Sequence, residues 1–159
     1  MSYFVVDVET DGNIIGKHSI VCFGAVKLNN ELNTTFYGKI RPISNNYVPE
    51  ILKISGFSRK EHENFDEPVT VMTNFANWVK ENSETRPVLF SDNNSFDASW
   101  LNYYFLVYCG ENPFGWSSRR IGDLFCGAEH DLFYYWKKHR KTKHTHNPLD
   151  DAIGNAEAL

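Results

Sequence analysis

Residues 2–12 read SYFVVDVETDG and place two acids at the end of an apolar run. Valine, phenylalanine and tyrosine are typical of strands, so residues 3–8 predict a buried first strand. Side chains two residues apart share one face of a strand, so Asp7 and Glu9 are expected side by side. Neighbouring carboxylates repel each other and lose hydration on burial. A positive partner is therefore expected at this end of the strand.

The remaining pattern predicts strands first and helix–strand alternation later. Strands are predicted over 19–27, 32–40, 87–90 and 119–125, with an Asn-Asn turn between the first two. Helices are predicted over 49–54, 68–82, 96–108, 132–139 and 148–159. This order indicates an α/β fold with a mixed sheet of about five strands, the first three antiparallel, flanked by helices. The length suits a single domain over residues 1–159.

Composition excludes several classes of protein. The chain is 42% apolar, has a net charge of −4 and contains three widely spaced cysteines, which fit neither a disulfide framework nor a zinc knuckle. No apolar run is long enough for a membrane helix, and the N-terminus lacks a secretory leader pattern, so no membrane association and a cytoplasmic location are expected. The chain ends soon after its last helix begins, so a natural continuation past Leu159 stays open.

Positive charge is concentrated in one segment. Residues 136–146 read WKKHRKTKHTH and hold five of the sixteen lysines and arginines. The acidic balance elsewhere argues against binding of nucleic acid through bulk positive charge. It leaves open an enzyme that meets phosphates through metal ions.

Two further segments place acids where helices begin. Residues 89–101, LFSDNNSFDASWL, put Asp97 in the first turn of a predicted helix. Residues 144–159, HTHNPLDDAIGNAEAL, put Asp150 and Asp151 at the start of the last helix, with His146 before them. Each acid alone is typical of a helix N-terminus, where the dipole favours negative charge.

Taken together, the acids indicate a metal site. Carboxylates at strand ends and helix starts gather at one edge of an α/β sheet, where ligands bind. Such a cluster needs cations, and oxygen ligands without cysteine select hard ions such as Mg²⁺ or Mn²⁺. Two ions about 4 Å apart suit in-line attack on phosphorus, and a histidine near neutral pKa suits proton transfer.

The segments VVDVETDG, NNSFD and HNPLDD resemble the three motifs of the DEDDh family over residues 3–159. These are the DnaQ-like 3′-5′ exonucleases of the ribonuclease H-like superfamily, with ribonuclease T, oligoribonuclease and the polymerase proofreading subunit among its members. The resemblance implies a ribonuclease H-like fold. It also implies a metal-dependent 3′-5′ exonuclease with two Mg²⁺ or Mn²⁺ ions that releases nucleoside 5′-monophosphates from single-stranded RNA or DNA.

The resemblance also implies roles for single residues. The metal-binding acids would be Asp7, Glu9, Asp97 and Asp151, and the general base would be His146. In the family motif the histidine and the last acid stand five residues apart, which favours His146 over His144 and Asp151 over Asp150.

Five residues are candidates for contact with the substrate. Thr10 lies where the main chain of the family meets the 3′-terminal nucleotide, and Asn93 belongs to the second motif. Phe57, in the segment ISGFS, either stacks on the terminal base or belongs to the core. Lys141 and Lys143 either hold the phosphates of an entering strand or belong to a solvated loop.

Two positions depart from the family pattern, and some alternatives stay open. Asp92 stands where a histidine or similar residue is usual, and Pro148 where alanine is usual. An alternative function is a two-metal phosphodiesterase for very short oligonucleotides, and another is a non-catalytic nucleic-acid-binding module. The aromatic residues 133–136 serve either the core, which is favoured, or the interface of a homodimer. No residue distinguishes RNA from DNA.

Overall fold

The computed structural model describes all residues, Met1–Leu159, and contains one five-stranded sheet of order β3-β2-β1-β4-β5. Its strands are β1 (Ser2–Thr10), β2 (Ile20–Lys27), β3 (Thr35–Lys39), β4 (Pro87–Ser91) and β5 (Ser118–Arg120). The first three are antiparallel neighbours, whereas β4 runs parallel to β1 and β5 runs parallel to β4. The predicted mixed sheet with three antiparallel strands is confirmed.

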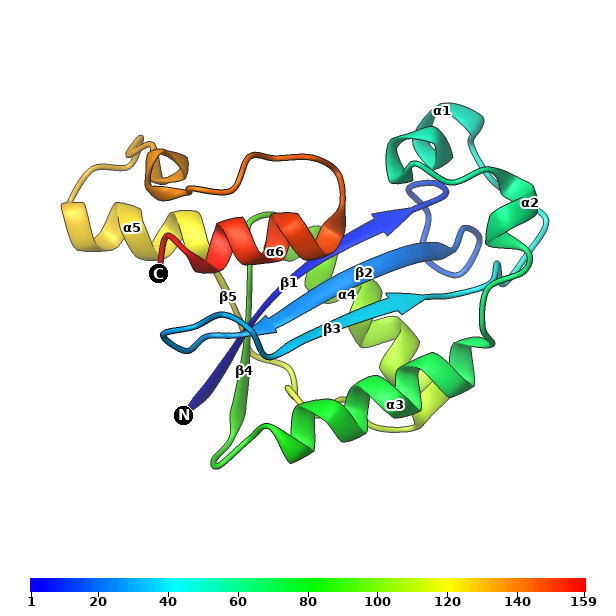
Figure 1. The fold of residues 1–159 in the computed structure, drawn as a ribbon, viewed down its shortest axis with the longest axis horizontal. Helices are drawn as coiled ribbons and strands as arrows, with labels where there is room; N and C mark the ends of the chain where they lie inside the picture. The colour runs from blue at the N-terminus through cyan, green and yellow to red at the C-terminus, as the bar shows by residue number, and fades with distance from the viewer.

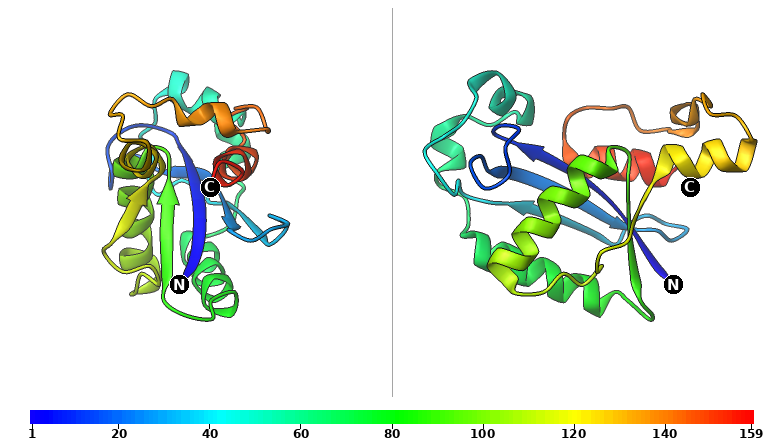
Figure 2. Two further views of the ribbon diagram at one scale, coloured as in Figure 1. Left: turned by 90° about the vertical axis from the view of Figure 1, so that its left-hand side faces the viewer. Right: turned by 180° about the vertical axis from the view of Figure 1, so that it is seen from behind.

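Helices cover both faces of the sheet (Figure 1). They are α1 (Pro49–Leu52), α2 (Arg59–His62), α3 (Pro68–Glu81), α4 (Asn94–Tyr104), α5 (Ile121–Glu129) and α6 (Pro148–Ala156). α5 and α6 share one core with the sheet and α3 and α4 share another, on the opposite face. α1 and α2 lie beyond the end of β1 (Figure 1 and Figure 2). None of these helices is both long and apolar enough to cross a membrane.

The central strand β1 contributes to two cores. Phe4, Val6 and Val8 point into the larger core, shared with α3 and α4. Val5 points the other way, into a smaller core that includes Ala152 of α6. This alternation is the period-two geometry of a strand buried on both faces. It fixes the face to which Asp7 and Glu9 belong.

The predicted strand over 119–125 is too long, and the two helices α2 and α5 are absent from the sequence prediction. The strand β5 ends at Arg120, and α5 follows directly. The chain continues as a helix because Ile121, Leu124 and Phe125 have the spacing of one helix face. The unpredicted helix α2 is closed at its start by a capping box between Ser58 and Glu61.

The predicted helix over 132–139 is reduced to a 3₁₀ turn, Trp136–His139. Aromatic residues have low helix propensity, and here they have no common apolar face. The expectation that residues 133–136 are core is wrong for Phe133 and Tyr135, which are 93% and 67% exposed. Only Trp136 of this run is buried, against α5 and α6.

Candidate active site

The acids of β1 lie on the face of the sheet that α6 covers. Asp7 and Glu9 follow Val5 on this face and pair with Gly24 and Cys22 of β2. Both acids are half-buried. A register shift between Glu9 and Thr10 ends the regular pairing just past the two acids.

Gly24 allows the start of α6 to touch the sheet beside Asp7. A Cβ atom at Gly24 would lie 2.4 Å from the backbone of Leu149, so only glycine permits this approach. Asn147 caps the helix, because its side-chain oxygen accepts the N–H groups of Leu149 and Asp150. The close approach and the cap together set the height of α6 above β1.

The last helix brings Asp151, and not Asp150, to the acids of β1. Asp151 is fully buried, and its charge acts on both Asp7 and Glu9. Asp150 lies one residue around the helix, where its carboxylate accepts the Thr145 hydroxyl at 3.3 Å. The helical turn separates the two neighbouring acids into different surroundings.

Asp97 reaches β1 from the first turn of α4. The helix follows β4, the parallel neighbour of β1, so the two strands end at the same edge of the sheet. Asp97 Oδ1 accepts the Val8 N–H at 3.2 Å. Its other oxygen, Oδ2, is buried and has no hydrogen-bond partner. A buried carboxylate oxygen without a partner is unfavourable unless a cation binds it.

Burial and mutual repulsion raise the pKa values of these acids. Burial, followed by the charges of Asp97, Glu9 and Asp151, raises the pKa of Asp7 well above its usual range. Burial, followed by the Asp151 charge, raises the pKa of Glu9 to about 7. Burial likewise raises the pKa of Asp97, although the hydrogen bond from the Val8 N–H opposes the shift. The cluster carries more negative charge than its surroundings balance.

The donor set fits hard divalent cations, but the side chains do not stand in a finished coordination shell. All four acids offer oxygen ligands, which Mg²⁺ and Mn²⁺ prefer. No three Asp, Glu, His or Cys side chains are close enough together to hold a metal ion as they stand. Binding therefore requires side-chain rotation within the cluster.

The loop before α6 presents two histidines at the cluster. His146 Nδ1 lies 3.7 Å from Glu9 Oε1, and its side chain is 52% exposed. His144 Nδ1 lies 2.9 Å from Asp151 Oδ1. The two rings are edge to face, with centroids 4.3 Å apart. His146 is thus the histidine that faces the β1 acids and solvent together.

Asp151 also fixes the backbone that carries His146. His146 has a φ of 61°, a left-handed conformation that costs about 1–3 kcal/mol for a non-glycine residue. Asp151 Oδ2 accepts the His146 N–H at 2.9 Å, and Oδ1 accepts the Thr145 N–H at 3.2 Å. One carboxylate therefore links the acidic cluster to the histidine loop.

Arg140 is the partner of Asp151 that the sequence did not reveal. Its Nη2 atom lies 2.9 Å from Asp151 Oδ1, and the two side chains are only 7% and 1% exposed. The guanidinium occupies the space over Gly154, where a Cβ atom would lie 2.6 Å from Nη2. Arg140 belongs to the basic segment 136–146, but unlike Lys141 and Lys143 it is buried and paired with a carboxylate.

Replacing Arg140 with methionine is expected to destabilise the protein by about 3 kcal/mol. Loss of one partner of a buried ion pair costs about 3–5 kcal/mol. Because Asp151 keeps its contacts with His144 and two N–H donors, we expect a cost at the lower end of this range. Urea denaturation at pH 7 measures the change. Lys141→Met, an exposed neighbour, is the control and should change stability by about 0.5 kcal/mol at most. Equal stability of the two variants would contradict the role of Arg140 as the buried ion-pair partner of Asp151.

Replacing Glu9 with glutamine is expected to stabilise the metal-free protein at neutral pH. The pKa of Glu9 is raised to about 7, so the folded state binds the proton more tightly and stability falls as pH rises from about 4.5 to 7. Glutamine does not titrate, so the variant should gain about 3 kcal/mol above pH 7 and nothing below pH 4.5. Chemical denaturation in EDTA across this range measures the difference.

The comparison with wild type cancels the titrating groups on which the Glu9 charge does not act. His62, whose pKa burial lowers to about 4, gives the opposite slope in both proteins. Glu129→Gln, at the exposed end of α5, is the matched control and should show no pH-dependent difference. A Glu9→Gln curve parallel to wild type would contradict the raised pKa.

The remaining substrate candidates lie around the cluster. Thr10 is buried, and its hydroxyl donates to the Gly12 carbonyl, so only its main chain remains for a ligand. Asn93 is exposed at the start of α4, and its side chain makes no capping bond. Lys141 and Lys143 are exposed and line a cavity of about 220 Å³ next to His144. The unusual acid of the second motif, Asp92, forms an ion pair with Lys137 at 2.6 Å.

Phe57 lies partly in the core and partly in a groove. Its ring packs edge to face on Phe65 at 5.0 Å, and Lys39 Nζ lies 4.9 Å from its centroid. The groove has a volume of about 570 Å³, and Tyr47 and Leu52 line it as well. Leu52 packs on Cys22, the cross-strand partner of Glu9. The groove therefore adjoins the Glu9 end of β1.

Comparisons with known proteins agree with this architecture. Residues 2–159 match the model of a family described as the 3′-5′ exoribonuclease Rv2179c-like domain. The chain is 33% identical over 157 residues to the 3′-5′ DNA exonuclease Cap18 of Escherichia coli, covering 97% of this chain and 82% of that protein.

Solved structures share the fold at low identity. The nuclease domain of 3′hExo, a DEDDh family member bound to rAMP, matches with a TM-score of 0.78 and 18% identity, covering 99% of this chain and 88% of that one. Exonuclease I of E. coli in complex with single-stranded DNA matches with a TM-score of 0.76 and 16% identity. That match covers 98% of this chain and 38% of the other.

Proposed function

The chain belongs to the family of 3′-5′ exoribonuclease Rv2179c-like domains and is a 3′-5′ exonuclease, and from this premise we propose how its residues act on single-stranded nucleic acid. Two divalent cations, Mg²⁺ or Mn²⁺, would be held by Asp7, Glu9, Asp97 and Asp151. When bound, such ions neutralise phosphate charge and activate water for in-line attack on phosphorus. The observation that supports this assignment most is the unpartnered, buried Oδ2 atom of Asp97 within a cluster of acids with raised pKa values.

The protein side chains divide the remaining work. His146, exposed beside Glu9, takes the proton of the attacking water. Phe57 and its groove receive the terminal base, and the main chain at Thr10 and the side chain of Asn93 flank the terminal nucleotide. The product is a nucleoside 5′-monophosphate, and the shortened strand carries a new 3′ hydroxyl.

The sugar of the substrate is a separate question. The family description names RNA, and the name of Cap18 names DNA. A protein distinguishes the two through contact with the 2′-hydroxyl. Matched RNA and DNA strands of one sequence are therefore both required as substrates.

Cleavage of end-labelled strands tests the proposed function. A 5′-labelled strand should give a ladder that shortens from the 3′ end, whereas a 3′-labelled strand should release its label at once as a mononucleotide. Mg²⁺ or Mn²⁺ should support the reaction and EDTA should stop it. Cleavage that persists in EDTA, or internal cleavage, would contradict the proposal.

Two further arms of this experiment separate the alternatives. A length series from two to about twenty nucleotides distinguishes a general exonuclease from a phosphodiesterase for very short oligonucleotides. Binding without cleavage under all metal conditions would indicate the non-catalytic module. Cross-linking in the same buffers tests for a homodimer.

Lys141 and Lys143 are proposed to hold phosphates of the entering strand. Neither lysine forms an ion pair within the protein, and both lie beside the histidine loop. Replacing both with alanine should lower the salt dependence of binding by about 1.4 in the log–log slope, the expected value for two phosphate contacts on a single strand.

Fluorescence anisotropy between 50 and 200 mM KCl, in a His146→Ala background with Mg²⁺, measures this slope. Lys80→Ala, which removes a lysine paired with Glu111 on the opposite face of the sheet, is the control and should leave the slope unchanged. An unchanged slope in the double variant would show that the strand does not pass over these lysines.

A further inference from the structure

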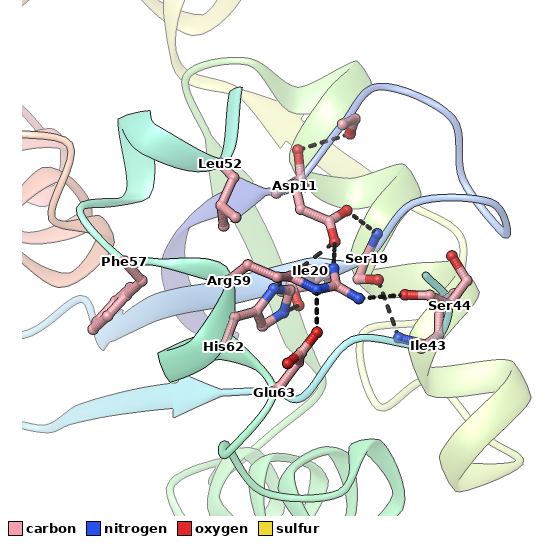
Figure 3. A network of polar contacts seen from close by, with 12 residues as sticks. Asp11, Ser19, Ile20, Ile43, Ser44, Leu52, Phe57, Arg59, His62 and Glu63 are labelled. Carbon is pink, nitrogen blue, oxygen red and sulfur yellow. Dashed lines mark hydrogen bonds and ion pairs between the residues drawn. The ribbon is translucent and has the colours of Figure 1, made fainter. Parts of the chain in front are cut away.

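A buried ionic network lies just past the end of β1 (Figure 3). Asp11 is fully buried, and its Oδ1 atom accepts the Ser19 N–H at 2.5 Å. Its Oδ2 atom lies 3.1 Å from Arg59 Nη1 and 3.8 Å from His62 Nδ1. A buried carboxylate is retained only where such partners compensate its lost hydration. The catalytic assignment above uses none of these residues.

Arg59 joins three separate segments of the chain. Besides Asp11, its Nη2 atom donates to the Ser44 carbonyl at 2.7 Å, and its Nε atom donates to Glu63 Oε1 at 2.9 Å. Its guanidinium also lies 4.9 Å from the ring centroid of Tyr47. The planar, rigid arrangement of donors suits arginine for contacts in several directions at once.

Two of these segments line the groove beside Phe57, the loop with Tyr47 and the start of α2 with Arg59. Arg59 directly follows the Phe57-Ser58 pair, and Tyr47 belongs to the loop held through Ser44. The carbonyl of Asp11 accepts the Val48 N–H at 2.7 Å, which ties this loop to β1 a second time. The end of β1 carries Glu9, so the network connects the groove walls to the acidic cluster.

Arg59 is placed to shape the groove and not to bind a ligand itself. All three of its guanidinium nitrogens donate to protein acceptors, and its side chain is only 15% exposed. Three of its five N–H groups are therefore used within the protein. The residue therefore differs from the free, exposed Lys141 and Lys143.

We propose that Arg59 and Asp11 are positioning residues that hold the aromatic groove at a fixed distance from the acidic cluster, so that a base bound in the groove places its own phosphodiester at the acids. This inference rests on the proposed exonuclease function. Reactions between positioned groups are sensitive to small displacements, and a shift of about 1 Å can lower the rate about 10²-fold.

The test compares two substrates that differ only in the terminal base. One is a single-stranded oligonucleotide with an ordinary 3′-terminal nucleotide, and the other ends in an abasic nucleotide. Arg59→Met and Arg59→Lys should lower kcat/KM on the ordinary strand by about 10- to 100-fold, the range that corresponds to loss of base stacking. On the abasic strand, both variants should match wild type, because no base occupies the groove.

Controls separate positioning from general damage. Mn²⁺ affinity, measured by calorimetry, should be unchanged in the Arg59 variants. Arg41→Met removes an arginine from an exposed ion pair with Glu67 and should leave both substrates unaffected. Should the single variants fail to fold, the double variant Asp11→Asn/Arg59→Met removes both buried charges together and should show the same substrate difference.

Several outcomes would overturn the inference. An equal loss of activity on both substrates, a lowered Mn²⁺ affinity or a double variant that also fails to fold would show that the network only stabilises the protein. No loss on either substrate would show that the network has no role in the reaction. Failure of the proposed function itself is distinguishable, because wild-type protein would then cleave neither strand.

Discussion

Asp7→Asn is expected to lower the rate of 3′-end cleavage by about 10³-fold or more. Four other acids act on Asp7, more than on Glu9 or Asp97, so it is the centre of the proposed cation site. A metal ion contributes several kcal/mol to phosphate chemistry, and each 1.36 kcal/mol corresponds to a factor of ten. Asparagine keeps the size of the side chain but removes its negative charge.

Two measurements distinguish loss of metal binding from loss of fold. Calorimetric titration with Mn²⁺ should show weaker uptake by the Asp7→Asn protein. The free energy of unfolding of the metal-free variant should rise, because the substitution removes the repulsion that raises the pKa of Asp7. Asp150→Asn is the matched control, since Asp150 faces the Thr145 hydroxyl and not the cluster. Equal activity of the Asp7 and Asp150 variants would refute the proposed cation site.

His146→Ala is expected to lower the rate about 10²- to 10⁴-fold while Mn²⁺ uptake stays near that of wild type. This range is the usual contribution of a positioned general base. The side chain is exposed and makes no close hydrogen bond, so its removal should leave stability almost unchanged. Rates under single-turnover conditions, with Mg²⁺ saturating, give the effect on chemistry.

The neighbouring histidine provides the control. His144 is equally exposed, at 54%, but its ring contacts Asp151 and not Glu9. We expect His144→Ala to change the rate less than tenfold. A larger loss in His144→Ala than in His146→Ala would transfer the role of base to His144.

The sequence predicted the parts of the fold that have clear periodicity. The helix 68–82 is observed as α3, Pro68–Glu81, because proline at its start and apolar residues every three or four positions leave little ambiguity. The first strand, predicted over residues 3–8 from its apolar run, is observed as β1, Ser2–Thr10. The predicted helix over 96–108 is observed as α4 followed by a π-helical turn, Phe105–Cys109.

Prediction failed where short segments carry mixed signals. The helix α5 contains Gly122 and Gly127, which lowers its apparent propensity, and its start directly continues β5. The segment 132–139 is rich in aromatic residues, but composition alone does not indicate burial, and Phe133 is almost fully exposed.

The acids of the candidate site could be predicted from the sequence, but the buried ion pairs around them could not. Motif order identified the four carboxylates and His146, and the structure brings them to one edge of the sheet. The Arg140–Asp151 and Asp11–Arg59 pairs depend on distances between segments that are far apart along the chain, which no local pattern contains. Arg140 looked like its basic neighbours, because charge alone does not distinguish a buried arginine from an exposed one.

Three of the four acids of the cluster are far apart in the sequence, Asp7 and Glu9 in the first strand and Asp151 in the last helix. Ribosomes extend a protein from its N-terminus at roughly 5–20 residues per second, so the last carboxylate is added many seconds after the first two. A nascent polypeptide that exposes β1 still lacks Asp151 and the histidine loop, so it contains only part of the proposed cation site. Synthesis therefore completes the proposed cation site only when the last helix, α6, has been made.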